Sequence, residues 1–263
     1  MKLATLSLLS ALVPLLSAEA ALVEKSVTYE KDGVTMEGFH VYDDAVTGKR
    51  PSVLVIHQWM GLTDNEKRRS RMLAELGFNV FAADIYGKGV RPQSVAEAGQ
   101  QAGKFKGDRA LYRSRLMAGL EVLRKDEHTD DSRIAAIGYC FGGTGVLEMA
   151  RAGAALNGVV SFHGGLGAGE GFAANPGEVK AKVLVLHGAA DPFVPADEVA
   201  GFQKEMAAAK ADWQMTFYSD AVHAFTQREA GNDATKGAAY NEAADRRSWQ
   251  AMKGFFAEIF ATK

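Results

Sequence analysis

The sequence predicts an α/β fold with a mostly parallel, twisted sheet, helices on both faces and an antiparallel hairpin at its N-terminal edge. Three observations lead to this prediction. Apolar segments of strand length alternate with longer segments of helical spacing along the 263 residues. The central strand candidates are apolar throughout, as strands buried on both faces are. Glycine follows several of them, where the chain turns into the next element.

The first predicted elements are two strands and a third that follows them. Residues 22–30 and 34–42 have the pattern of strands, with Asp32 and Gly33 between them. Asp-Gly between two such segments favours a tight hairpin turn. Residues 51–57, PSVLVIH, form a continuous apolar run and are predicted as a strand buried on both faces.

Helices and strands then alternate. Thr63 and Glu66 have the spacing of a capping box, residues 68–76 have helical spacing, and Gly77 is expected to end that helix. The remaining predicted strands are 79–84, 133–138, 158–164, 182–188 and 213–218, and the remaining predicted helices are 109–125, 141–151, one near 196–209 and 237–260.

Composition limits the number of domains and the class of partner. The chain is 47% hydrophobic and 24% charged, which is enough for one substantial core. We expect one domain over residues 21–263, without a cap domain, because the glycine-rich loop from Gly164 to Lys182 is short. A net charge of −2 argues against a non-specific nucleic-acid binder. No dinucleotide-binding fingerprint occurs, so we expect no cofactor.

Residues 1–20 are typical of a secretory signal peptide. Lys2 precedes an apolar run that reaches about Leu16, and Ala18-Glu19-Ala20 provides a cleavage site. We expect cleavage after Ala20 and an exported protein, periplasmic or secreted, with no membrane association afterwards. An uncleaved N-terminal anchor is the alternative.

Cys140 is the only cysteine of the chain. It stands between Gly138 and Gly142, after a predicted strand and before a predicted helix, which is the pattern of a nucleophile elbow with Cys in place of Ser. So tight a turn needs glycine two residues to either side. The helix N-terminus would favour the thiolate, and the N–H of Phe141 would face an oxyanion. The alternative is a buried, inert thiol.

A base and a residue to orient it follow in the expected order. Asp191 comes after one predicted strand and His223 after the last, which gives the order nucleophile, acid, histidine. Taken singly, Asp191 is compatible with a turn before Pro192, and His223 with a surface loop. Their joint placement favours a catalytic triad with Cys140.

With these motifs the chain resembles the dienelactone hydrolase family, a branch of the α/β-hydrolases with a Cys-Asp-His triad. The resemblance covers essentially the whole mature chain and implies the α/β-hydrolase fold. It implies Cys140 as nucleophile, His223 as general base and Asp191 as its orienter, with the N–H groups of Phe141 and Trp59 as oxyanion donors. The segments that carry it are HQWMGL, AADIYGKG, GYCFGGTG, LHGAADPFVP, VHAFT and YNEAADRRSWQAMKGFF.

The sequence departs from this family at substrate-binding positions. Gln58 stands where dienelactone-cleaving members have a glutamate that helps to deprotonate the thiol. Gln227 stands where one substrate-binding arginine is expected, and residues 96–100, where the other is expected, contain none. The preference for an anionic lactone therefore does not carry over. Nearby alternatives are Arg91, Arg109, Arg113 and Arg228.

Other side chains near the strand ends are candidates for a pocket or a metal site. Apolar and aromatic residues flank the catalytic segments, which suggests the mouth of an apolar pocket. The histidines lack metal-ligand spacing, so we expect no metal and expect all but His223 to hydrogen-bond loop backbone. The predicted pocket residues are Gln58, Met60, Phe193 and Phe225, and the histidines are His57, His163, His187 and His223.

The sequence thus predicts a hydrolase that cleaves small carboxylic esters or lactones through an acyl-enzyme on Cys140. Two alternatives remain: a thioesterase or peptidase with the same triad, and a non-catalytic binding protein that keeps the elbow for structure. The expected partner is a small molecule, and we expect a monomer. The natural substrate and pathway are not specified by the sequence.

Overall fold

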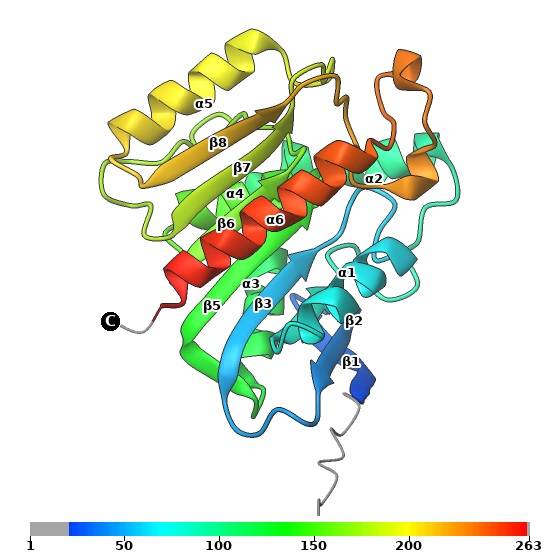
Figure 1. Ribbon diagram of the computed structural model, residues 1–263, viewed down its shortest axis with the longest axis vertical. Helices are drawn as coiled ribbons and strands as arrows, with labels where there is room; N and C mark the ends of the chain where they lie inside the picture. The colour runs from blue at the N-terminus through cyan, green and yellow to red at the C-terminus, as the bar shows by residue number, and fades with distance from the viewer. Residues whose placement is uncertain (1–20, 262–263) are drawn as a thin grey trace, which may run out of the picture.

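The computed structural model describes residues 21–261, which form an eight-stranded sheet between two layers of helices (Figure 1). The predicted signal peptide and its cleavage site lie outside the described residues. Across the sheet the strand order is β1-β2-β4-β3-β5-β6-β7-β8. The strands are β1 (Leu22–Lys31), β2 (Val34–Asp43), β3 (Arg50–Ile56), β4 (Asn79–Ala83), β5 (Thr129–Tyr139), β6 (Gly158–Phe162), β7 (Lys182–Gly188) and β8 (Trp213–Tyr218).

The pairing of the strands confirms the predicted sheet. β1 pairs antiparallel with β2, and the turn between them has Asp32 and Gly33 at φ 52° and 71°, the left-handed region that a two-residue hairpin turn requires. β2 is also antiparallel to β4. All pairs from β4 through β3 to β8 are parallel, which sends the carboxyl ends of these strands to one edge.

The helices agree with the prediction except at two places. They are α1 (Asp64–Ala74), α2 (Val95–Gly107), α3 (Arg109–Lys125), α4 (Phe141–Arg151), α5 (Ala196–Ala208) and α6 (Glu242–Ile259). Helix α2 was not predicted, because it contains several glycines and buries only Ala98, Ala102 and Phe105. Helix α6 begins at Glu242 rather than at 237, because the side chain of Asn241 caps it by accepting the N–H of Ala244.

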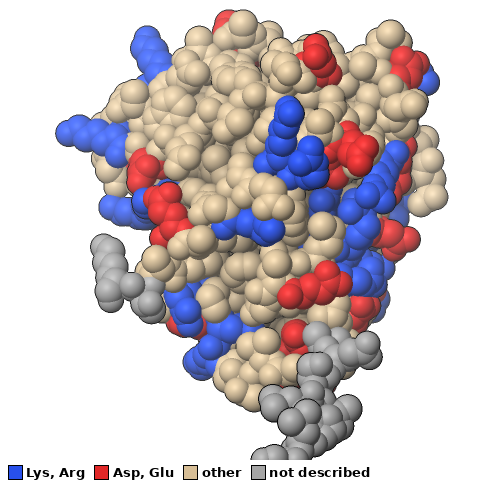
Figure 2. Space-filling model, in the orientation of Figure 1, with Lys and Arg blue, Asp and Glu red and all other residues tan. Residues whose placement is uncertain are grey.

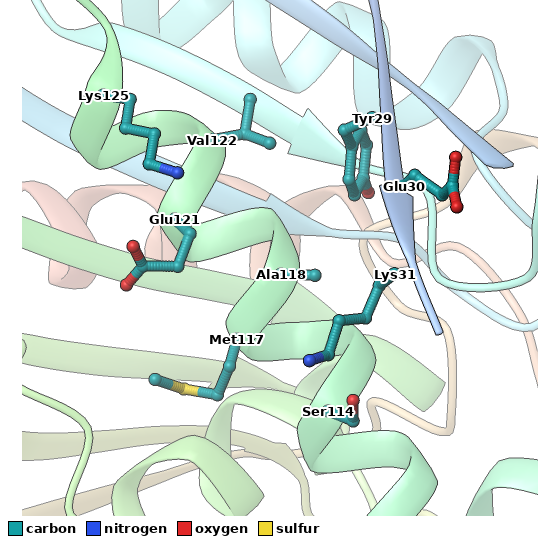
Figure 3. Close-up of a pocket in the computed structure, with 9 residues that line it drawn as sticks. All are labelled: Tyr29, Glu30, Lys31, Ser114, Met117, Ala118, Glu121, Val122 and Lys125. Carbon is teal, nitrogen blue, oxygen red and sulfur yellow. The ribbon is translucent and has the colours of Figure 1, made fainter. Parts of the chain in front are cut away.

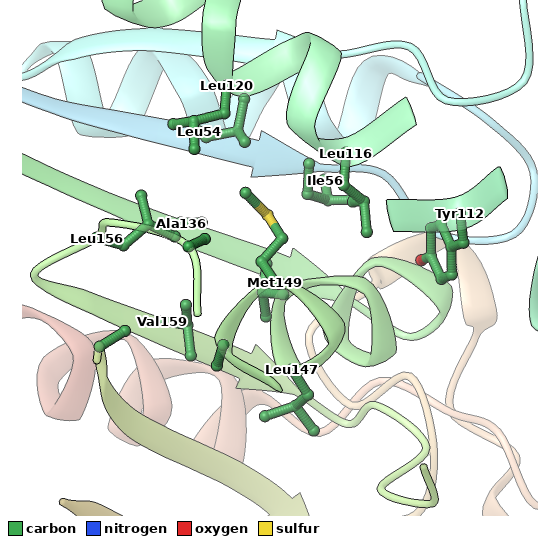
Figure 4. Packing of buried hydrophobic residues seen from close by; sticks show 14 of the residues in the cluster. Leu54, Ile56, Tyr112, Leu116, Leu120, Ala136, Leu147, Met149, Leu156 and Val159 are labelled. Atoms are coloured by element: carbon green, nitrogen blue, oxygen red, sulfur yellow. The ribbon is translucent and has the colours of Figure 1, made fainter. Parts of the chain in front are cut away.

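Two hydrophobic cores lie on opposite faces of the sheet. Helices α1 and α6 cover one face and pass in front of the sheet in Figure 1. Helices α2, α3, α4 and α5 cover the other. Figure 4 shows this second core, where Leu54 and Ile56 of β3 pack beneath Leu116 and Leu120 of α3, with Met149 of α4 beside them. Buried side chains on both faces explain why the central strands are apolar throughout.

Candidate active site

Cys140 lies in a strained turn between β5 and α4, where the elbow was predicted. Its backbone has φ 53° and ψ −111°, a conformation that non-glycine residues rarely adopt. A Cβ on Gly138 would lie 2.0 Å from the carbonyl oxygen of Gly142, and a Cβ on Gly142 would lie 2.2 Å from that of Ile56. The absence of a side chain at Gly138 therefore lets the turn close on itself, and its absence at Gly142 lets strand β3 pack against the turn.

The structure brings Cys140, His223 and Asp191 into contact. Nε2 of His223 lies 3.0 Å from Sγ of Cys140, and its Nδ1 lies 2.8 Å from Oδ2 of Asp191. The other carboxylate oxygen of Asp191 accepts the N–H of Phe193 at 2.9 Å. Nucleophile, base and orienter thus form one continuous hydrogen-bonded chain.

The backbone on either side of His223 is held by a distant segment. The N–H of His223 donates to the carbonyl of Gly237, and its carbonyl accepts the N–H of Ala239, both at 3.0 Å. Arg69 of α1 adds a further restraint by donating to the carbonyl of Thr226 at 2.9 Å and to Asp245. These bonds fix a loop that would otherwise be free to move the imidazole away from the thiol.

The electrostatics of the pair favour separated charges. Burial raises the pKa of Cys140, but the charge and hydrogen bond of His223 lower it, and Lys106 and the N–H of Phe141 lower it further, so the pKa lies below its usual value. Burial lowers the pKa of His223, but the Cys140 thiolate and the bond to Asp191 outweigh burial and raise it to about 10. Thiolate and imidazolium therefore stabilise each other.

The N–H groups of Phe141 and Trp59, the oxyanion donors that the resemblance implies, have different surroundings in the structure. Phe141 is the first residue of α4, so its N–H belongs to the free N-terminus of that helix. Trp59 lies in the loop after β3, and its N–H has no acceptor among residues 21–261. Trp59 lines the same cavity as Cys140, and Phe141 is the residue directly after Cys140.

Cys140 opens into a cavity of about 890 Å³. Gln58, Met60 and Phe193 line it, which is where the sequence placed them. Phe193 is 59% exposed and Val95 of α2 is 71% exposed, so two apolar side chains stand at its mouth. The cavity also holds two cations that sequence reasoning missed, Lys106 and Lys236. Lys106 was missed because α2, which carries it, was not predicted.

One predicted pocket residue does not line the cavity. Phe225 is fully buried and packs against the rings of His163 and Tyr218 in the core beneath α6. The prediction was wrong because the chain turns at Ala224, with φ 58°, which sends the next side chain into the core instead of toward the thiol.

The candidate arginines are engaged elsewhere, whereas Gln227 does line the cavity. Arg91 contacts Asp84 and its own loop, and Arg113 pairs with Glu148. Arg109 lies against Gly169, and Arg228 lies over the ring of Tyr240. None of the four is among the cavity residues.

Three histidines surround the triad without forming a metal site. His57 bonds to the carbonyl of Gln58, and His163 to the hydroxyl of Thr226, while His187 packs against Phe217. The prediction that they bond to loop backbone therefore holds for His57. It is wrong for His163, which bonds to a side chain, and for His187, whose ring makes no hydrogen bond within residues 21–261. Within residues 21–261, no group of three or more His, Cys, Asp or Glu side chains is placed to hold a metal ion.

A second hollow lies away from the triad. This smaller hollow of about 360 Å³ lies between β1 and α3, where Val122 of α3 lies across from Tyr29 of β1 (Figure 3). Ser114 lines it and donates to Asp32 at 2.9 Å, but no histidine or thiol is among its lining residues. On the face in Figure 2, basic and acidic side chains are interspersed. No helix in the described part of the chain is long and apolar enough to cross a membrane.

Comparison with known proteins places this arrangement in a family. The model of the dienelactone hydrolase family matches residues 36–260. A solved structure described as a dienelactone hydrolase-like promiscuous phosphotriesterase from metagenomic libraries is 39% identical, with a TM-score of 0.86 over 92% of this chain and 100% of that chain. A structure called m3DLH is 36% identical, with a TM-score of 0.87 over the same shares.

Curated relatives agree with this result. Protein usf of Aquifex pyrophilus is 28% identical over 248 residues, which is 88% of this chain and 97% of its own. A protein of Aquifex aeolicus, provisionally named a carboxymethylenebutenolidase, is 28% identical over 204 residues, 76% of this chain and 85% of its own. Since the family match spans most of the described sheet and the cavity at its edge, this chain belongs to the dienelactone hydrolase family of α/β-hydrolases and is a hydrolase.

Proposed function

We propose that this protein hydrolyses small carboxylic esters or lactones through a thioester formed on Cys140. The observation that carries the proposal is the contact of one imidazole with both the thiol, at 3.0 Å, and a buried carboxylate, at 2.8 Å, beside an 890 Å³ cavity. An imidazole placed between a thiol and a carboxylate activates the nucleophile and accepts its proton.

In the first half of the reaction, the Cys140 thiolate attacks the substrate carbonyl carbon. The N–H groups of Phe141 and Trp59 stabilise the charge that develops on the carbonyl oxygen. When the tetrahedral intermediate collapses, the bond to the leaving oxygen breaks, and that oxygen takes the proton from Nε2 of His223. The products of this step are an alcohol, a thioester on Cys140 and a neutral imidazole. In a lactone the alcohol stays attached to the acyl group.

In the second half, water replaces the alcohol. Neutral His223 takes a proton from the water through Nε2, and the oxygen attacks the thioester carbon. Collapse expels the Cys140 thiolate and releases the carboxylic acid, which restores the thiolate–imidazolium pair. Asp191 keeps the imidazole oriented and stabilises its positive charge in both halves. Ester and water thus become acid and alcohol, with no other reactant.

The cavity supports a neutral substrate with an apolar substituent. Phe193 and Val95 offer apolar contacts at the mouth, and no arginine lines the walls. Lys106 and Lys236 are the cations present, but Lys236 already pairs with Asp233 at 3.6 Å. We expect neutral esters to be hydrolysed at least as well as matched anionic lactones. Thioesters and short peptides are the alternative substrates for the same triad.

The test is a panel of neutral short-chain aryl esters, lactones, acyl thioesters and peptides, assayed with the wild type and Cys140→Ala. We expect the wild type to prefer esters or lactones, and the substitution to lower kcat by about 10³-fold or more, because the triad acts as a unit. Mass spectrometry of the stopped reaction should find the acyl group on Cys140. Ester hydrolysis within a few-fold of the wild type in Cys140→Ala would reject the mechanism.

A second candidate activity is the hydrolysis of neutral phosphotriesters. It is favoured by the 39% identity to the solved structure of a protein described as a promiscuous phosphotriesterase. A neutral aryl phosphotriester added to the same panel tests it. Release of the aryl alcohol that disappears in Cys140→Ala would support this activity, and release that survives the substitution would exclude it.

The proposed place of this activity is outside the cytoplasm. The proposal rests on the order of charges, apolar residues and small residues in positions 1–20. It is independent of the triad and is tested separately below.

A further inference from the structure

The loop that carries Trp59 is held by several hydrogen bonds on either side of that residue. The carbonyl of Gln58 accepts Nδ1 of His57 at 2.7 Å and the N–H of Gly61 at 3.1 Å. The side-chain oxygen of Gln58 accepts the N–H of Met60 at 2.8 Å. Such a loop has little freedom to change the direction of its peptide groups.

The bonding of His57 fixes its tautomer. The N–H of Ile85, at the end of β4, donates to Nε2 of His57 at 3.1 Å. A backbone N–H can only donate, so Nε2 is unprotonated and the ring proton is on Nδ1, where it donates to the Gln58 carbonyl. His57 is fully buried, and burial lowers its pKa to about 4, so the ring stays neutral at physiological pH.

The second restraint acts on the next peptide group. The hydroxyl of Tyr86 donates to the carbonyl of Trp59 at 2.9 Å. Tyr86 itself is placed by Asp84, whose Oδ1 accepts the N–H of Tyr86 at 3.2 Å, and its ring packs edge-on against His57. The two peptide groups that flank the Cα of Trp59 are therefore both held, the first by His57 after β3 and the second by Tyr86 after β4.

These restraints determine where the N–H of Trp59 points. The Gln58–Trp59 peptide bond is trans, so its C=O and N–H point in opposite directions. With the C=O held against His57, the N–H is directed away from that ring. This N–H has no acceptor within residues 21–261, although the N–H groups of the next two residues, Met60 and Gly61, are paired. The two bonds accepted by the same peptide also polarise it and strengthen its N–H as a donor.

We infer that His57 is a positioning residue for the oxyanion site: by holding the Gln58 carbonyl, it keeps the N–H of Trp59 directed at the substrate carbonyl oxygen, with Tyr86 fixing the following peptide. His57 is not among the residues that line the cavity. The inference rests on the proposed ester hydrolysis and adds a role to a residue outside the triad.

The experiment separates this role from a general structural one. His57→Leu removes both hydrogen bonds, whereas His57→Asn keeps an N–H donor near the position of Nδ1. Each variant is assayed for kcat and KM with a neutral aryl ester that the wild type hydrolyses, and for the rate at which iodoacetamide alkylates Cys140. Alkylation displaces iodide at a saturated carbon and forms no oxyanion, so it reports the thiolate–imidazolium pair alone.

We expect His57→Leu to lower kcat by about 10²-fold, since loss of one oxyanion donor costs 10² to 10³. We expect KM and the alkylation rate to stay within about twofold of the wild type, and His57→Asn to recover about tenfold in kcat. Tyr86→Phe, which deletes only the bond to Trp59, should lower kcat in the same direction by a smaller factor, and it provides the test if His57→Leu does not fold.

Three outcomes would overturn the inference. A kcat within about twofold of the wild type in His57→Leu would show that the restraint is unimportant. If His57→Leu does not fold, the same result in Tyr86→Phe would show it. A parallel fall in alkylation would show that the substitution disturbs the triad instead. A wild type that hydrolyses no ester would overturn the proposed function and the inference with it, whereas an active wild type with an unaffected variant would overturn the inference alone.

Discussion

The thiol of Cys140 is subject to two opposing influences, and its chemistry depends on which is larger. Burial favours the neutral thiol, whereas the imidazolium of His223 at 3.0 Å favours the thiolate. The net lowering of the Cys140 pKa and the rise of the His223 pKa to about 10 indicate that the ion pair prevails. In such a pair the histidine already holds the proton, so its first act in catalysis is to donate it.

The pair predicts a specific pH dependence. At about pH 7 the pH lies below the His223 pKa, so we expect Cys140 to be alkylated by iodoacetamide faster than an ordinary thiol with a pKa of ~8.5. The alkylation rate should fall as the pH falls through the lowered Cys140 pKa. Ester hydrolysis should also decline as the pH rises through about 10, where His223 loses its proton. Mass spectrometry and initial rates across a pH series measure both.

The control for this profile is His223→Ala. Without the imidazolium, the thiol pKa should rise toward its usual value, and alkylation at neutral pH should slow. An alkylation rate at neutral pH equal to that of the wild type would contradict the ion pair.

Gln58 leads to a second prediction at the same scale. It lines the cavity with Cys140, and its side-chain oxygen binds the N–H of Met60, a bond that a glutamate can also accept. Gln58→Glu should therefore fold normally and add a negative charge near the thiol, which raises the Cys140 pKa and repels anionic substrates. The expected result is an alkylation profile shifted to higher pH and a lower kcat/KM for an anionic lactone than for a neutral one.

The uncharged control is Gln58→Leu, which loses the acceptor without gaining charge. If Gln58→Glu instead improves turnover of the anionic lactone, a cation in the cavity compensates the new charge. Lys106 is the first to test, because it already acts on the Cys140 pKa.

At the scale of elements, the turn from β5 to α4 determines where the thiol stands. Two glycines let the chain pass within contact distance of itself and of β3. The turn places Cys140 immediately before α4, at the end where backbone N–H groups are free and the helix dipole is positive. The strain at φ 53° is maintained by the packing of β3, β5 and α4 around it.

We predict that Gly142→Ala disrupts this element. Its Cβ would lie 2.2 Å from the carbonyl oxygen of Ile56, a backbone atom that cannot move without shifting β3. The expected cost is about 1–3 kcal/mol or more in the free energy of unfolding, measured by urea denaturation, with a large loss of esterase activity.

The matched control is Gly254→Ala in α6, where a Cβ would meet nothing within 4 Å. There we expect a gain of about 0.5–1 kcal/mol from the better helix propensity of alanine, with activity unchanged. Equal stabilities of the two variants would show that the close approach at Gly142 is relaxed easily.

At the scale of the whole molecule, the parallel sheet brings distant segments to one edge. Trp59 follows β3, Cys140 follows β5, Asp191 follows β7 and His223 follows β8. Parallel strands place these carboxyl ends side by side, so residues more than a hundred positions apart meet at one cavity. Helix α2 covers the same edge and supplies Val95 and Lys106.

Export is the prediction for the whole chain. Protein purified from the producing cells should be recovered outside the cytoplasm and begin at Ala21, as measured by mass spectrometry of the intact protein. A chain recovered intact from Met1 in the soluble cytoplasmic fraction would reject the signal-peptide interpretation. A variant with Lys2 and the apolar run deleted should remain inside and, because the eight strands and the cavity are built from residues beyond the deleted segment, should keep the esterase activity.

The sequence by itself determined the features that local patterns encode. Alternating apolar segments predicted the parallel sheet, Asp32-Gly33 predicted the hairpin, and the glycines around Cys140 predicted the elbow, because each depends on neighbours within a few residues. The order of Cys140, Asp191 and His223 along the chain was readable for the same reason, since each follows a recognisable strand. The structure brings these three side chains together.

Only the tertiary structure decided the direction of side chains in the loops and the partners they meet. The side chain of Phe225 packs in the core, and Arg113 of α3 forms an ion pair with Glu148 of α4. Both contacts depend on how distant elements pack together. Lys106 lines the cavity from α2, a helix that the sequence did not predict because its apolar face is weak. The bond from Ile85 to His57 joins the segments that follow β4 and β3, two strands that become neighbours only in the folded sheet. Such contacts depend on long-range register, which no local periodicity encodes.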